Sequence, residues 1–117
     1  MAKLFLLNPG FTDKKREANT LYYCPHSAHF LGVLNYYPKL KEELEVIFVD
    51  FERPRKLLVK LVGEENQGCP NLVIPKEEAG PNDDLSYFES YGDCFFLNSE
   101  EMISRYLAEK YNIGIPH

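Results

Sequence analysis

The chain of 117 residues has no tryptophan, only three cysteines, and no apolar run long enough to cross a lipid bilayer. Three widely spaced cysteines exclude the paired disulfide framework that is typical of small secreted scaffolds. Residues 1–7 lack the long apolar core of a signal peptide, and the turn-forming residues Asn8, Pro9 and Gly10 follow them. We therefore expect a cytoplasmic protein whose thiols stay reduced until they are used.

Positive charge is also scarce. The chain has 13 Lys and Arg against 18 Asp and Glu, which gives a formal net charge of -5. Nucleic-acid binding requires clustered positive charge, and the one dense cationic run, residues 14–16, is flanked by Asp13 and Glu17. We interpret this run as a solvated loop, and we expect neither a nucleic-acid nor a membrane partner.

The length and composition are typical of one globular domain, residues 1–117, with 44% hydrophobic and 26% charged residues. Residues 4–7 form a short apolar run that is typical of a strand buried on both faces. A helix over residues 25–37 and a strand over residues 44–51 follow. Such a β-α-β unit predicts parallel strands joined by a right-handed crossover.

The second half predicts a helix that opens at Pro54 and ends at Gly63, with a buried stripe that includes Leu57 and Leu58. A short strand lies between Pro70 and Pro75, where proline is confined to the strand ends. An acidic excursion, residues 76–93, carries aromatic residues that are candidates for a returning strand, and residues 94–97 form the last core strand. In the final helix we expect Asn98 to be the N-cap of a capping box with Glu101, and Gly114 to end the helix.

Cys24 stands directly before a helix that begins with Pro25, the position at which proline is best tolerated. Cys24 is then expected to be the helix N-cap. Its sulfur would face free N–H groups and the positive end of the helix dipole, which favour thiolate over thiol. The alternative is a buried cysteine that acts as a small hydrophobic residue.

Three segments in this order resemble the thioredoxin superfamily, specifically the glutaredoxins and the N-terminal domains of glutathione transferases. They are Tyr23 to Ser27 at the first helix, Cys69 to Val73 before the third strand, and Ser99 to Leu107 at the last helix. Residues 4–11, 53–55 and 61–67 are similar to a small bacterial family known only as a domain of unknown function. The resemblance implies a thioredoxin-like α/β fold, β-α-β-α-β-β-α, with a four-stranded mixed sheet and helices on both faces.

The same resemblance implies a set of site residues. Pro70 would be a cis-proline facing Cys24, and the backbone of Cys69 would pair with the glutathione peptide. Ser99 and Glu100 would meet the γ-glutamyl group, although the transferase pattern has these two residue types in the opposite order. Tyr22, Tyr23 and Tyr87 are candidates to line a small-ligand groove, or else they pack on the core.

Position 27 decides which exchange mechanism is available. A dithiol mechanism requires a second cysteine there, but the residue is Ser27, which can donate a hydrogen bond to a thiolate and cannot resolve a mixed disulfide. Exchange at Cys24 would therefore be monothiol, with glutathione or another cysteine as the resolving group. Cys69 is the in-chain candidate if the two sulfurs converge, and otherwise it is a packed, unpaired thiol. We expect Cys94 to belong to the core.

Two histidines, His26 and His29, lie on the same early helix. His26 could tune the Cys24 thiolate by charge or hydrogen bonding, or it could be a solvated residue of the first turn. The spacing of His26 and His29 suits a helical metal site, but no fourth ligand is evident, so we expect no metal. An iron–sulfur cluster shared by two chains is the remaining alternative for a monothiol site.

Two functional hypotheses follow. The first is a glutaredoxin-like protein that exchanges disulfides with a small thiol or a protein thiol at Cys24, as a monomer or weak homodimer. It needs no obligatory cofactor, and glutathione is the candidate co-substrate. It would not be a complete glutathione transferase, since only six residues follow Tyr111. The second hypothesis is a non-catalytic binding module that keeps the thioredoxin-like fold and holds a partner through residues 76–93 or the 8–21 loop.

Overall fold

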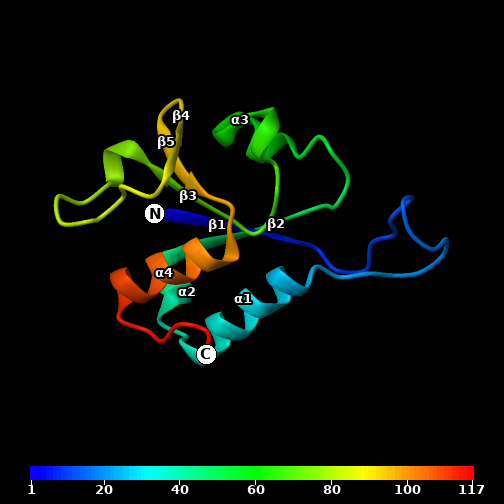
Figure 1. The fold of residues 1–117 in the computed structure, drawn as a ribbon, viewed down its shortest axis with the longest axis horizontal. Helices are drawn as coiled ribbons and strands as arrows, with labels where there is room; N and C mark the ends of the chain where they lie inside the picture. Colours follow the sequence, from blue (N-terminus) through cyan, green and yellow to red (C-terminus); the bar gives the residue numbers. More distant parts are fainter.

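A five-stranded mixed sheet organises the molecule, which a computed structural model describes over residues 1–117. The strand order is β2-β1-β3-β5-β4, and β1 and β2 are parallel while the other neighbours are antiparallel (Figure 1). The strands are β1 (Ala2–Leu7), β2 (Leu44–Val49), β3 (Asn71–Pro75), β4 (Glu89–Tyr91) and β5 (Cys94–Leu97).

The expectation of four strands was wrong because β4 adds a fifth at the edge of the sheet. All three residues of β4 are exposed, so the strand has no buried face and none of the apolar alternation that marks a strand in sequence. It pairs with β5, with Tyr91 opposite Cys94. The aromatic part of the 76–93 excursion thus returns as a strand.

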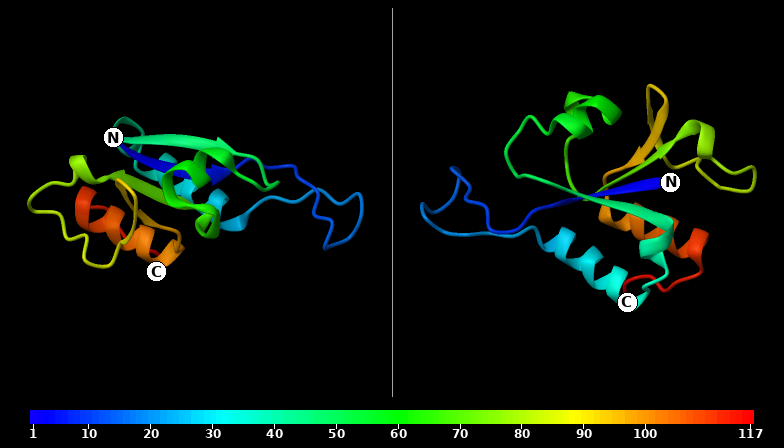
Figure 2. Two further views of the ribbon diagram at one scale, coloured as in Figure 1. Left: turned by 90° about the horizontal axis from the view of Figure 1, so that it is seen from above. Right: turned by 180° about the vertical axis from the view of Figure 1, so that it is seen from behind.

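Helices cover both faces of the sheet, as expected. α1 (Pro25–Tyr36) and α4 (Glu100–Tyr111) lie on one face, and α3 (Lys56–Val62) lies on the other (Figures 1 and 2). A short helix, α2 (Leu40–Glu43), which the sequence analysis missed, leads into β2. Two 3₁₀ turns, η1 (Glu64–Asn66) and η2 (Lys76–Glu78), flank β3.

The alternating side chains of β1 divide the core into two clusters. Leu4 and Leu6 belong to the larger cluster under α1 and α4, whereas Phe5 and Leu7 belong to the smaller cluster under α3. All four are buried. This is the two-sided burial that the apolar run predicted, because successive side chains of a strand point to opposite faces.

Several predicted helix boundaries were wrong. Ser99, not Asn98, is the N-cap of α4, and its side chain accepts a hydrogen bond from the Met102 amide. That helix ends at Asn112, which adopts the left-handed conformation that caps helices, and so ends before Gly114. α3 begins after Arg55 rather than at Pro54, and Leu57 is 55% exposed.

The segment between β1 and α1 projects from the body of the protein (Figures 1 and 2). At its base Phe11 forms an antiparallel bridge with Tyr22 and stacks on Phe51, with 4.3 Å between ring centroids. Phe11 therefore ties the segment to the sheet. No helix of the protein combines the length and the apolar character needed to span a bilayer.

Candidate functional site

Cys24 is the N-cap of α1, as the sequence predicted. Its backbone is extended, and its Sγ accepts a hydrogen bond from the Ser27 amide at 3.4 Å. The side chain is partly exposed and packs against the smaller core cluster under α3. The sulfur therefore occupies the acceptor place that a capping oxygen usually takes, in a side chain that is only partly buried.

Ser27 is placed differently from the prediction. Its side chain is buried, with 3% exposed, and its hydroxyl accepts a hydrogen bond from the Leu7 amide at 3.0 Å. The contact with Cys24 comes from the Ser27 backbone N–H and not from the hydroxyl. Ser27 thus joins the start of α1 to the end of β1 through its hydroxyl, and its backbone N–H donates to the Cys24 sulfur.

Cys69 and Pro70 lie beside the same end of β1. Phe5 pairs with Asn71, and continuing this antiparallel register by two residues sets Leu7 opposite Cys69. The Cys69–Pro70 peptide bond is cis, Pro70 is buried, and Cys69 is partly buried against the cluster that also receives Cys24. The Cys24 segment, through Ser27, and the Cys69 segment therefore both adjoin the C-terminal end of β1.

The Cys69 thiol is electrostatically distinct. Burial raises its pKa to about 11, Arg55 and Arg53 act in the opposite direction, and Cys24 adds to the rise. Cys69 is therefore a protonated thiol at neutral pH. Cys94 is buried on β5, where burial also raises its pKa, and it belongs to the core as expected. All three thiols are free of disulfide bonds.

Arg55 is a site residue that the sequence reasoning missed. It is 7% exposed, and its guanidinium donates to main-chain oxygens on two different segments: Nε to Asp50 and Phe51 at 3.1 and 3.2 Å, Nη2 to Phe51 at 2.6 Å, and Nη1 to Gln67 at 2.8 Å. Arg55 thereby fixes the turn after β2 to the turn before Cys69. The sequence showed Arg55 only as part of the run 53–55 that resembles the small bacterial family.

Side-chain amides complete this turn. Gln67 Oε1 accepts from the Arg55 amide at 2.6 Å, and its Nε2 donates to the Glu64 carbonyl. Asn71, which is fully buried, donates from Nδ2 to the carbonyls of Asn66 and Gly68 at 3.0 and 3.1 Å. The backbone that leads into Cys69 is thus held by buried polar groups on both sides.

His26 lies near Cys24 in sequence, but its hydrogen bond goes elsewhere. His26 Nδ1 is 2.8 Å from Glu100 Oε2, and His29 Nδ1 is 3.3 Å from the same oxygen without hydrogen-bond alignment. The structure therefore joins the starts of α1 and α4 through Glu100 rather than placing His26 on the thiol. These three side chains do not form a metal-binding arrangement.

Of the residues predicted to bind glutathione, Pro70 and Ser99 lie on neighbouring segments. Leu72 pairs with Leu97, so continuing the β3–β5 register by two residues sets Pro70 opposite Ser99. Ser99 and Glu100 are already engaged, Ser99 as a cap and Glu100 with the histidines. Tyr23 is 65% exposed beside Cys24.

The three tyrosines proposed for one groove are separated. Tyr22 contacts Phe11 and Arg16 in the projecting segment, whereas the Tyr87 hydroxyl donates to Glu109 on α4. Tyr22 and Tyr87 therefore contact two different parts of the molecule. Local sequence could not predict this separation, because Tyr22 and Tyr87 lie in irregular segments.

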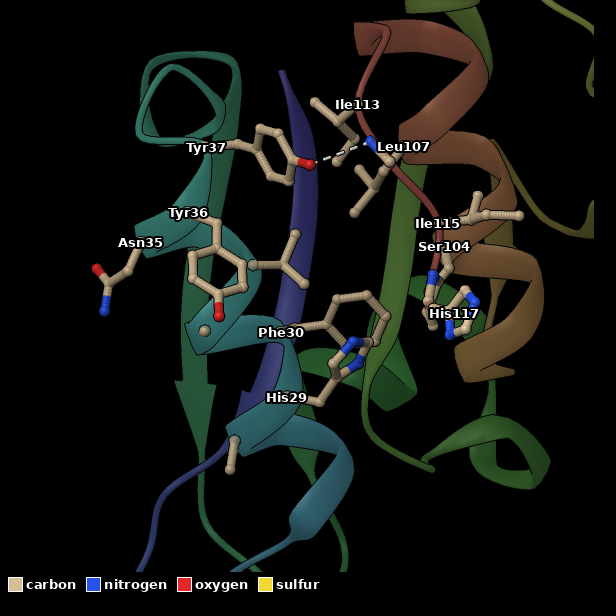
Figure 3. Close-up of a pocket in the computed structure, with 15 residues that line it drawn as sticks. His29, Phe30, Asn35, Tyr36, Tyr37, Ser104, Leu107, Ile113, Ile115 and His117 are labelled. Atoms are coloured by element: carbon tan, nitrogen blue, oxygen red, sulfur yellow. Dashed lines mark hydrogen bonds between the residues drawn. The ribbon is translucent and has the colours of Figure 1, made fainter.

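A sizeable cavity lies away from the cysteines. It has a volume of about 670 Å³ and lies between α1, α4 and the C-terminal segment (Figure 3). His29 and Tyr37 line it, and the Tyr37 hydroxyl accepts from the Gly114 amide at 3.3 Å. Neither Cys24 nor Cys69 lines this cavity.

Comparisons with known proteins place the chain in a family. No curated protein and no solved structure matches it significantly. A family model described as "Protein of unknown function (DUF3088)" matches residues 1–115, nearly the whole chain. The protein therefore belongs to the DUF3088 family.

Proposed function

We propose that the protein is a thioredoxin-like thiol-disulfide exchange protein in which Cys24 forms mixed disulfides with a small thiol such as glutathione. The Cys24 thiolate attacks one sulfur of a disulfide, a Cys24–thiol disulfide forms, and the second thiol leaves as thiolate and takes up a proton. No cysteine stands at position 27, so the first step does not use a neighbouring thiol on the helix.

One observation carries the proposal: the Cys24 sulfur caps α1 and accepts the Ser27 N–H, in a partly exposed side chain. Hydrogen bonds to a sulfur and a helix N-terminus both stabilise developing negative charge on it. These features support a nucleophilic role. Cys69 and Cys94 lack them, and burial raises the pKa of each thiol.

The proposed thioredoxin-like arrangement has support from the strand order. A parallel β1–β2 pair continues into antiparallel β3 and β5, and helices lie on both faces. β4 is then an added edge strand outside the shared part of the fold.

The backbone of Cys69 supports the choice of a peptide-like thiol. Neither its N–H nor its carbonyl has a hydrogen-bond partner within the chain. An extended peptide can pair with such free main-chain groups in the manner of an added strand. Glutathione, whose cysteine sits between two amide bonds, fits this description.

The test is to mix the reduced protein with oxidised glutathione, alkylate the remaining thiols, and map them by mass spectrometry. We expect Cys24 to be protected from alkylation by its disulfide while Cys94 is alkylated after unfolding. Cys24→Ser should lose the reaction with glutathione, and Cys94→Ser is the matched control that should keep it. The proposal is wrong if Cys24 stays fully alkylatable, or if Cys24→Ser consumes oxidised glutathione as fast as the native protein.

A second candidate, a non-catalytic binding module, is favoured by the projecting segment. Leu21 and Tyr23 are 70% and 65% exposed directly before Cys24, so an apolar contact surface adjoins the thiol. Under this alternative Cys24 would be inert toward disulfides. The glutathione experiment therefore discriminates between the two functions.

A further inference from the structure

Arg55 is a buried charge with no carboxylate partner. Its side chain forms no ion pair, and every acceptor of its guanidinium is a main-chain oxygen. Buried charges in proteins are normally paired, because taking an ion out of water is costly. A buried guanidinium whose acceptors are all neutral carbonyl groups would be stabilised further by a negative charge formed beside it.

Two N–H donors of the guanidinium have no acceptor. Arginine carries five N–H groups, and Arg55 uses Nε–H, one N–H of Nη1 and one N–H of Nη2. One N–H on each Nη atom has no acceptor in the chain. These donors are available to a sulfur anion or to an oxyanion.

Two cysteine thiols lie within electrostatic range of Arg55. The Cys69 and Cys24 sulfurs act on the guanidinium as anion-forming groups, and the turn that Arg55 holds leads directly into Cys69. The bond from Nη1 to the Gln67 carbonyl ends two residues before Cys69. From the side of the thiol, the charged and titratable groups that act on Cys69 are Arg55, Cys24 and Arg53.

We propose that Cys69 is the second thiol of the site and that Arg55 is its fixed cation, so that a Cys69 thiolate resolves the mixed disulfide on Cys24. This inference rests on the proposed function of Cys24. Arg55 is a positioning residue here, because it holds the turn that carries Cys69 and stabilises the thiolate without touching the substrate.

The chemistry of the step balances with a disulfide of a small thiol as the oxidant. Cys69 loses its proton to solvent, and its sulfur attacks Cys24 Sγ in the mixed disulfide. The Cys24–Cys69 bond forms while the bond to the small thiol breaks, and the leaving thiolate takes up a proton. Overall, two protein thiols are oxidised to one disulfide, and one small-molecule disulfide is reduced to two thiols.

The first experiment follows the products formed from oxidised glutathione by intact mass and by peptide mapping under non-reducing conditions. We expect the native protein to yield a Cys24–Cys69 linked peptide with little glutathione adduct. Cys69→Ser should instead accumulate the adduct at Cys24. Cys94→Ser, which removes the remaining thiol, should behave like the native protein.

The possible failures are distinguishable. If the native protein and Cys69→Ser both accumulate a stable adduct at Cys24, the role of Cys69 is wrong and the proposed function stands. If no variant forms either an adduct or a linked peptide, both are wrong.

The second experiment measures how fast the linked form appears in excess oxidised glutathione as a function of pH. Arg55→Gln removes the charge but keeps amide donors for the carbonyls, and we expect at least about a tenfold slower reaction near pH 8, with the profile displaced to higher pH. Arg55→Lys keeps the charge and should restore most of the native profile. Arg53→Gln, at an exposed position, should shift it little.

Thermal unfolding of each variant verifies that it is folded before its profile is compared. A profile of folded Arg55→Gln that superimposes on the native one would overturn the role of Arg55. If Arg55→Gln does not fold, Arg55→Lys decides, and a folded Arg55→Lys that never forms the linked peptide would contradict the role of charge.

Discussion

Cys24 ends a long segment that projects from the sheet (Figure 1), whereas Cys69 ends a turn that buried side chains bond to the surrounding backbone. Between residues 12 and 21 every hydrogen bond is local and joins Asp13 to Lys15 or Arg16. In the turn before Cys69, by contrast, three buried side chains reach main-chain groups: Arg55, Gln67 and Asn71.

This difference gives the two sides of the site different mechanical properties. A buried polar network that is satisfied on several sides fixes one conformation. A segment with few tertiary contacts opens locally at low free-energy cost. The turn before Cys69 is therefore conformationally fixed. The segment before Cys24 can adapt to a partner that carries the exchanging thiol.

The largest effect should come from removing the guanidinium that fixes the turn before Cys69. Arg55→Ala leaves the carbonyls of Phe51 and Gln67 without their donor, and we expect a loss of about 3 kcal/mol or more in the free energy of unfolding. Urea denaturation measures it. Arg53→Ala, an exposed neighbour, is the control and should change stability by less than about 0.5 kcal/mol. Equal losses of stability for the two substitutions would contradict the conclusion that Arg55 fixes the turn before Cys69.

Asn71→Ala should produce the next largest effect. It removes the donors to the carbonyls of Asn66 and Gly68 from a fully buried position, for an expected loss of about 2 kcal/mol. The loss is moderated because Asn71 Oδ1 has no hydrogen-bond partner to forfeit. Asn82→Ala, at an exposed site, serves as the control in the same urea series. An unchanged midpoint for Asn71→Ala would show that the turn does not depend on this amide.

Alkaline pH should weaken the fold through Cys69. Folding raises the Cys69 pKa from 9.0 to about 11, so between these pH values the folded chain keeps a proton that the unfolded chain releases. The contribution is complete below pH 9 and is lost as the pH rises toward 11, at about 1 kcal/mol per pH unit.

Cys69→Ala tests this slope. Between pH 9 and 10 the variant should lose stability less steeply than the native protein in urea titrations. Burial raises the pKa of Cys94 as well, and that contribution has the same sign in both proteins. Parallel slopes would contradict the buried environment assigned to Cys69.

The smallest effect on stability is expected in the projecting segment. Lys15→Ala should change the free energy of unfolding by less than about 0.5 kcal/mol, because the side chain is exposed and has no tertiary contact. Limited trypsin digestion should cut first after Lys14, Lys15 or Arg16 and later after Lys56. Early cleavage near Lys56 would contradict the conclusion that the projecting segment opens more easily than the turns around Arg55.

Local pattern was enough to predict much of the fold. The apolar run of β1, the Pro25 helix start and the short strand after Pro70 are all visible in sequence because backbone preference and side-chain alternation act over a few residues. The N-cap role of Cys24 followed in the same way and was confirmed. The sequence indicates β4 only as a candidate strand, not counted in the sheet, because its side chains are all exposed and show no apolar alternation.

The electrostatics of the site could not be predicted in this way. His26 meets Glu100 across 74 positions of sequence, and Arg55 is buried only because the turns at Phe51 and Gln67 converge on it. An isolated arginine is usually exposed, so its sequence neighbourhood favoured a surface position. Long-range packing, not local preference, made it part of the site.

The most direct test of the central claim, that Cys24 is the reactive thiol, is site-resolved alkylation of the native reduced protein with iodoacetamide at about pH 8. Mass spectrometry then gives the labelling rate of each cysteine. The partly exposed, capped position of Cys24 predicts that it is labelled well before Cys69, whose pKa is raised to about 11, and before the buried Cys94. Labelling of Cys24 at the rate of Cys69 or Cys94, or more slowly, would contradict the claim.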